Sequence, residues 1–145
     1  MSKAKMIFVN LPVSNLARST AFYEAIGATK NPQFSDDSGS CMVISETIFV
    51  MLLTHDKFRH FTPKQICDAR TTSEVLICLS ADGREAVDDV VTKAKGAGGN
   101  ADPSPKQDYG FMYGRSFEDL DGHIWEVMWM DVEAATRAQP AAANA

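Results

Sequence analysis

The chain has 145 residues, which is enough for one domain or for two small halves that share one core. Its composition, 45% hydrophobic and 23% charged, is typical of a globular protein, and a net charge of -5 argues against the basic surface of a nucleic-acid-binding protein. No apolar run approaches the ~20 residues of a membrane span, and Lys5 is followed by a strand rather than by the apolar part of a signal peptide. We therefore expect a cytoplasmic protein that binds neither nucleic acid nor a membrane.

The cysteines and histidines predict no metal site of their own. Cys41, Cys67 and Cys78 are widely spaced and form no Cys-x-x-Cys motif, so they predict neither a disulfide framework nor a zinc knuckle. We expect them to be small, buried apolar side chains. His55 and His60 are five positions apart, which is not the spacing that places two imidazoles on one helical face.

The first half of the chain predicts the order strand, helix, strand, strand, strand. Residues 6–13 form a β-rich, largely buried run. Asn15 can cap a helix that ends at Gly27, a residue suited to the left-handed conformation. Three more strands are expected at residues 28–35, 40–45 and 47–54, with turn residues between the first two.

Residues 55–72 form a long polar connector. A linker with a turn of helix is the preferred interpretation, and a lid or an interface element is the alternative. The second half then repeats the order of the first: a buried strand at 74–80, a helix capped by Asp82, a short strand near Ala101 and a hairpin at 111–131.

These elements predict an α+β fold built from two βαβββ modules. We expect a single domain over residues 1–133, with modules at about 5–54 and 73–131. The Ala-rich stretch 134–145 has no periodic apolar face, so we expect a flexible tail there.

Glu126, on the last strand of the hairpin, is the most informative residue. Alternation along a strand divides this one into two faces: Ile124, Glu126, Met128 and Met130, and Trp125, Val127 and Trp129. Both faces are otherwise apolar, and a carboxylate buried there needs an ion pair, a hydrogen bond, a proton or a metal ion. A salt bridge to Arg115 on the partner strand and a catalytic or ligand-binding role are both open.

Two stretches of the sequence resemble the vicinal oxygen chelate superfamily. The first runs from Val13-Ser14-Asn15-Leu16 through Ser19 and Ala21-Phe22-Tyr23 to Gly27. The second is DLDGHIWEV at residues 119–127, whose turn is similar to the family's Asp-Pro-Asp-Gly turn with Leu in place of Pro. The superfamily contains glyoxalase I, fosfomycin-resistance enzymes, extradiol dioxygenases and bleomycin-binding proteins, and the chain is most similar to its lactoylglutathione-lyase-like branch. The resemblance, from about Lys5 to Asp131, implies that the two modules form a cupped, eight-stranded mixed sheet.

The resemblance also implies where a metal would bind. In metal-using members, one side chain from each of four strands holds a divalent ion. The corresponding positions here are Glu126, Glu74 on the strand that opens the second half, Phe8 and Met51. Phe8 cannot donate and Met51 is a soft ligand, so the resemblance implies at most a weakly bound divalent cation on Glu74 and Glu126.

Two functions are therefore expected. The first is a glyoxalase-like lyase or isomerase that acts on a small carbonyl or thiol-conjugate substrate, with Glu126 as the catalytic base. The second is a metal-free protein that sequesters a small molecule, as bleomycin-resistance proteins do. For the ligand contacts we expect Phe8, Asn10, Met51, Tyr113, Arg115 and Met128.

The resemblance further implies a homodimer. Clefts of this family close against a partner, and Trp125 and Trp129 on the last strand would supply apolar surface. Pairing of the two modules within one chain and exchange of modules between two chains are both open.

Overall fold

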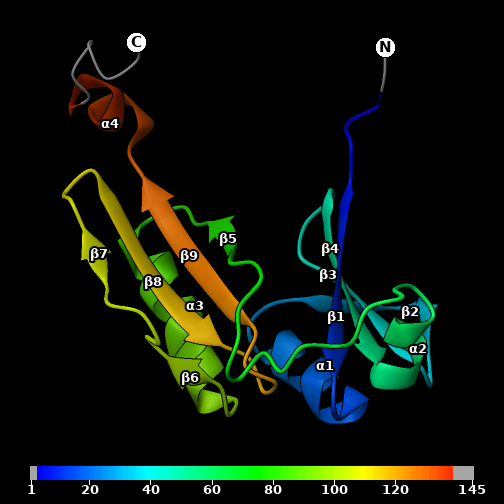
Figure 1. Cartoon of the computed structure of the whole chain (residues 1–145). Coiled ribbons are helices and arrows are strands. Elements are labelled where there is room, and N and C mark those ends of the chain that lie inside the picture. Colours follow the sequence, from blue (N-terminus) through cyan, green and yellow to red (C-terminus); the bar gives the residue numbers. More distant parts are fainter. Residues whose placement is uncertain (1–2, 139–145) are drawn as a thin grey trace.

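The computed structural model describes residues 3–138, which form two modules joined by a connector (Figure 1). In each module a helix packs on one face of a sheet. The two sheets diverge like the arms of a V, with α1 near its closed end and with the start of β1 and the helix α4 at its open end. The predicted α+β fold with two successive modules is confirmed.

The first module has the predicted order of elements. Asn15 caps the helix, because its side-chain oxygen accepts a hydrogen bond from the Arg18 N–H at 3.0 Å. Gly27 follows the helix with φ of +113°, a conformation that favours glycine. The strands form sheet A in the order β1-β4-β3-β2, with β1 and β4 parallel. The elements are β1 (Ile7–Val13), α1 (Leu16–Ala25), β2 (Thr29–Asp36), β3 (Gly39–Val43) and β4 (Ile48–Thr54).

The connector contains one short helix, α2 (His55–Arg59), as the preferred interpretation predicted. Thr54 caps it, and its Oγ1 accepts a hydrogen bond from the Lys57 N–H at 3.2 Å. The chain then continues without a regular element to the second module.

The second module forms sheet B, with the strand order β5-β9-β8-β6 and with β7 paired to β8. Two boundaries differ from the prediction. The first strand begins at Ile77 rather than at Glu74, and Gly83 takes the N-cap position predicted for Asp82, without a side-chain bond. The elements are β5 (Ile77–Ser80), α3 (Arg84–Gly96), β6 (Asn100–Ala101), β7 (Gln107–Asp108), β8 (Met112–Glu118) and β9 (Ile124–Met130).

The strands of one chain form two sheets, of four and five strands, rather than one continuous sheet of eight. The extra strand is β7, in the loop before the hairpin. Strand β1 is one edge strand of sheet A, and β5 is one edge strand of sheet B. The β5 edge is the side of sheet B that lies nearer to β1 (Figure 1). Both edges therefore present unpaired backbone groups.

One hydrophobic core serves both modules. Phe22 of α1 packs against Phe117 of β8, and Tyr23 packs edge-on against Trp125 of β9, with ring centroids 6.0 Å apart. Burial of an aromatic side chain contributes roughly 2–3 kcal/mol, so these contacts hold the two modules against each other. Trp125 is only 1% exposed, and the expectation that it supplies dimer surface is wrong.

Residues Val132–Ala138 form a further helix, α4. The tail predicted at 134–145 is therefore helical as far as Ala138, and its remaining residues lie outside those described. Two local contacts support this helix: Asp131 accepts a hydrogen bond from the Ala134 N–H at 3.1 Å, and Glu133 pairs with Arg137 one turn later. Within residues 3–138, no helix is long and apolar enough to cross a membrane.

Candidate functional site

Sheet B has one face covered by α3 and one face free of helices, which we call the open face. Phe117, Trp125 and Val127 point to the covered face, where they pack with Val87 and Val91 of α3. The alternation of side chains then places Glu126 and Met128 on the open face, as the sequence predicted.

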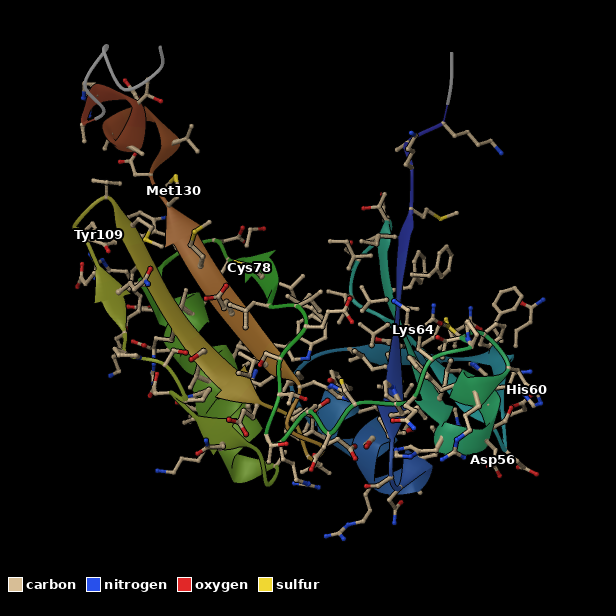
Figure 2. The ribbon with its side chains drawn as sticks, in the orientation of Figure 1. Asp56, His60, Lys64, Cys78, Tyr109 and Met130 are labelled. Carbon is tan, nitrogen blue, oxygen red and sulfur yellow. The ribbon has the colours of Figure 1, made fainter. Side chains whose placement is uncertain are left out.

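Three neighbouring strands bring a row of polar side chains together on the open face. Cys78 of β5 is the register partner of Glu126, and Glu126 is the register partner of Ser116 on β8. Register partners lie on the same face of a sheet, so the carboxylate stands between a thiol and a hydroxyl. Figure 2 shows Cys78 on β5, beside β9.

This row borders a hollow of about 110 Å³. The thioethers of Met112 and Met128 supply apolar lining, and Gln107 supplies an amide. Glu126 is half-buried, and its carboxylate makes no hydrogen bond or ion pair with any residue between 3 and 138. A partly desolvated acceptor without a partner can receive a hydrogen bond, a cation or a proton from a ligand.

Cys78 is an exposed thiol, and so is Cys67, whereas Cys41 is buried. The prediction of three buried cysteines is therefore correct for Cys41 only. Desolvation and the negative charge of Glu126 raise the pKa of Cys78. The thiol is consequently protonated at neutral pH and can act as a weak hydrogen-bond donor on the open face.

Arg115 and Tyr113 point to the opposite, covered face. Arg115 donates to both carboxylate oxygens of Asp102, at 3.0 and 2.7 Å, and to Asp88 at 2.9 Å, while the Tyr113 hydroxyl donates to Asp88 at 2.7 Å. These bonds hold the pKa values of Asp88 and Asp102 below the ordinary value. The suggested Arg115–Glu126 salt bridge is absent because Arg115 is opposite Val127 in the register.

Asn10 and Glu74 line a different hollow, of about 250 Å³, between the connector and the end of β1. Phe58 and Ile66 of the connector supply part of its apolar lining. Glu74 is exposed and precedes β5, so the strand does not place it beside Glu126. Among residues 3–138, no three His, Cys, Asp or Glu side chains are grouped so that they could hold a metal ion.

Phe8 and Met51 share the face of sheet A that carries Asn10, as the alternation predicts. Phe8 stacks on Phe49 with ring centroids 4.8 Å apart and remains 49% exposed, while Met51 is half-buried between the register positions of Asn10 and Cys41. The structure thus brings Phe8, Asn10 and Met51 together on sheet A, and Glu126 and Met128 together on sheet B.

The two stretches that carry the family resemblance meet at the joint between the modules. Asp119 is buried and accepts hydrogen bonds from the Tyr23 hydroxyl at 2.6 Å and from the N–H groups of Asp121 and His123. Trp125 donates its indole N–H to the Tyr23 oxygen at 2.9 Å. Burial raises the pKa of Asp119 and that of Tyr23.

Asp121 extends this joint to the start of α1. Its carboxylate accepts hydrogen bonds from the Ser14 N–H at 2.9 Å and from the Ser19 hydroxyl at 3.4 Å. Gly122 has φ of +93°, and a Cβ there would approach the Arg70 backbone to 2.9 Å. A glycine is therefore required in the turn for both conformation and space.

No protein-family model and no curated protein sequence matches this chain. Solved structures do. A hypothetical protein from S. aureus is 29% identical, with a TM-score of 0.72 over 88% of this chain and 95% of its own. A glyoxalase/bleomycin resistance protein/dioxygenase family enzyme from Burkholderia phytofirmans is 17% identical, with a TM-score of 0.69 over 88% and 99%. A fosfomycin resistance protein from Listeria monocytogenes is 18% identical, with a TM-score of 0.65 over 91% and 98%.

The chain has the fold of the vicinal oxygen chelate superfamily. The resemblance found in the sequence is thereby confirmed for the fold. The vicinal oxygen chelate fold supports several chemistries, so the reaction or ligand has to be argued from the side chains on the open face.

Sequence reasoning missed Cys78, Ser116 and Met112 as neighbours of Glu126. Their alternation along each strand is visible in the sequence, but the register between strands is not. Cys78, Glu126 and Ser116 form one row only because the register pairs Cys78 of β5 and Ser116 of β8 with Glu126 of β9.

Proposed function

We propose that this protein binds a small organic molecule on the open face of sheet B and that Glu126 anchors it. The observation that carries the proposal is the half-buried Glu126 carboxylate, which has no partner among residues 3–138 and lies between Cys78 and Ser116, close to two methionines. Methionine side chains adapt to flat or irregular apolar surfaces, and a carboxylate selects a hydrogen-bond donor or a cation. The ligand class is therefore a planar or apolar body that carries a donor or positive group.

The donor set supports a function without a tightly held transition metal. Such an ion needs three or four nitrogen, oxygen or sulfur ligands in a compact arrangement. Glu126 has a protonated thiol and a hydroxyl beside it, Glu74 lines another hollow, and Phe8 offers no donor atom. The residues present do not fit a glyoxalase-type metal centre.

Binding can be tested with thioflavin T, a cationic dye whose fluorescence rises when a binding site restricts rotation about the bond between its rings. We expect the wild-type protein to bind one dye and Glu126→Gln to bind it about tenfold more weakly, since a charge-assisted contact is lost. Glu85→Gln is the matched control, because Glu85 is exposed on α3, on the other side of sheet B. Equal affinity of the wild type and both variants would contradict the proposal. Bleomycin and fosfomycin, to which proteins of this fold confer resistance, are the next ligands to titrate.

A glyoxalase-like lyase or isomerase is the second candidate. The observation that favours it is again the Glu126 carboxylate, which no other described residue pairs with and which could remove a proton from a carbon next to a carbonyl and return it to the neighbouring carbon. The test is turnover of the hemithioacetal of methylglyoxal and glutathione, followed by NMR. Activity that disappears in Glu126→Gln but persists in Glu85→Gln would favour an enzyme over a binding protein.

We also propose a homodimer in which the exposed edge strands meet. The apolar side chains that support this are on or beside β1 and β5, and each is about half exposed or more: Met6, Ile7, Phe8, Val75 and Leu76. Pairing of β1 in one copy with β5 in the other would cover these side chains and satisfy the free backbone groups. Light scattering at micromolar concentration tests the assembly, and we expect Ile7→Lys to shift a dimer toward monomer. A wild-type monomer under these conditions would contradict the assembly.

A further inference from the structure

An apolar cavity of about 200 Å³ lies at the joint of the modules, on the covered side of sheet B. We call it the junction cavity. Both modules contribute to its wall, and the lining includes Ile26, Ile44, Leu79, Val90, Phe117 and Trp125. Sheet B separates it from the open face, because Leu79 and Trp125 point away from Cys78 and Glu126.

The buried polar side chains at the wall already have partners. The Trp125 indole N–H donates to Tyr23, and the Tyr23 hydroxyl donates to Asp119. Among residues 3–138, no buried side-chain nitrogen or oxygen lacks a hydrogen-bond partner. Water needs two to four polar partners in a cavity, and the side chains of this wall offer it one hydroxyl, that of the exposed Ser80, so an apolar guest is favoured over water.

Aliphatic side chains supply the surface that a guest would contact, because Tyr23, Phe117 and Trp125 are each only 1% exposed. The three rings pack on one another beneath this surface, with the Phe117 and Trp125 centroids 6.4 Å apart and Tyr23 edge-on to Trp125. An apolar cavity of about 150 Å³ is large enough to bind benzene, so the junction cavity can hold one ring with a small substituent.

The side chains of Ile26, Ile44, Leu79 and Val90 are only partly buried, although they pack against the core. Their remaining apolar surface faces the joint, and a guest of this size would cover it. We propose that the junction cavity is a second binding site, distinct from the open face, for a small uncharged molecule such as a monocyclic aromatic. A guest that contacts both modules would stabilise the joint by mass action.

Toluene is the probe. In methyl NMR spectra of the full chain, we expect millimolar toluene to shift the resonances of Ile26, Ile44, Leu79 and Val90. It should leave the Met128 methyl group on the open face unchanged. An absence of shifts in the four wall residues, or shifts in Met128 instead, would overturn the proposal.

Two variants separate the sites. Val90→Phe places a ring in the cavity and should weaken toluene binding about tenfold or more, since loss of a well-fitted apolar contact has this effect. Glu126→Gln should leave toluene binding unchanged while it weakens thioflavin T binding. If Val90→Phe does not fold, the methyl shifts of the wild type still decide the question. Equal toluene affinity in folded Val90→Phe and the wild type would overturn the proposal.

Discussion

Asp119, in the turn between β8 and β9, and Glu126, in the middle of β9, are carboxylates of one hairpin with opposite surroundings. Asp119 is 6% exposed and accepts hydrogen bonds from Tyr23, Asp121 and His123. Glu126 is half-buried and makes no such bond with any described residue. The Asp119 carboxylate accepts hydrogen bonds that hold the fold together, whereas the Glu126 carboxylate remains available to bind a ligand.

The comparison shows that the motif with the clearest family resemblance, the DLDG turn, has a structural role. The DLDG turn and the start of α1 bind each other through Asp119 with Tyr23 and through Asp121 with Ser14. These contacts fix the two modules relative to each other and so place the open face. Their presence predicts the fold, and they say nothing about the reaction.

The largest effect is expected where the joint is broken. Asp119→Ala should lower the free energy of unfolding by about 3 kcal/mol or more, because a buried hydroxyl and two N–H groups lose their acceptor. Urea denaturation followed by circular dichroism measures this loss. Asp119→Asn, which keeps one acceptor oxygen, is the control and should lose less. A loss below about 1 kcal/mol in the alanine variant would show that the joint does not hold the modules.

An intermediate effect is expected for the ion cluster on the covered face. The Arg115 side chain is 13% exposed and donates to Asp88 and Asp102, so Arg115→Met should lower the free energy of unfolding at pH 7 by about 2 kcal/mol.

The pH dependence provides a second readout of this cluster. Hydrogen bonds from Tyr113 and Arg115 lower the pKa of Asp88, and those from Arg115 lower the pKa of Asp102, from 3.8. A carboxyl group whose pKa is lower in the folded than in the unfolded state stabilises the fold at pH values above its unfolded-state pKa. This stabilisation is lost as the pH falls through its folded-state pKa. Wild-type stability should therefore decrease below about pH 4, and Arg115→Met should show a shallower decrease. Parallel profiles for the two proteins would be inconsistent with this cluster.

A small effect on stability is expected on the open face. Glu126→Gln removes a charge that has no partner among the described residues, so the free energy of unfolding should change by less than about 0.5 kcal/mol. The same urea series measures it. A destabilisation as large as that of Asp119→Ala would mean that Glu126, like Asp119, has a structural role.

A weak effect is also expected from metal ions. A ligand at 100 times its Kd stabilises a fold by ~2.7 kcal/mol, which raises the melting temperature by several degrees. Zinc, nickel, manganese and magnesium at micromolar concentration should each give less than that, because the open face lacks a compact set of ligands. The measurement is a thermal-shift titration of the wild type and Glu126→Gln, with elemental analysis of untreated protein. A stoichiometric metal that is lost in Glu126→Gln would restore the metalloenzyme hypothesis.

The sequence by itself determined the order of the elements in the first module and the faces of the strands. The alternation around Glu126 placed Trp125 and Val127 on one side of β9 and Glu126 and Met128 on the other. Asn15 and Gly27 marked the two ends of α1. These features depend on local backbone geometry, which neighbouring residues specify.

Only the tertiary structure decided which side chains meet. The sequence allowed an ion pair between Arg115 and Glu126, but the register places Val127 opposite Arg115. Arg115 instead donates hydrogen bonds to Asp88 and Asp102. Likewise, the path of the connector separates Glu74 from Glu126, and the pairing of β5 with β9 brings Cys78 beside Glu126. A shift of one residue in register reverses every face of a strand, and register depends on the turn between paired strands and on the packing of one face against the core, which the alternation within a single strand does not specify.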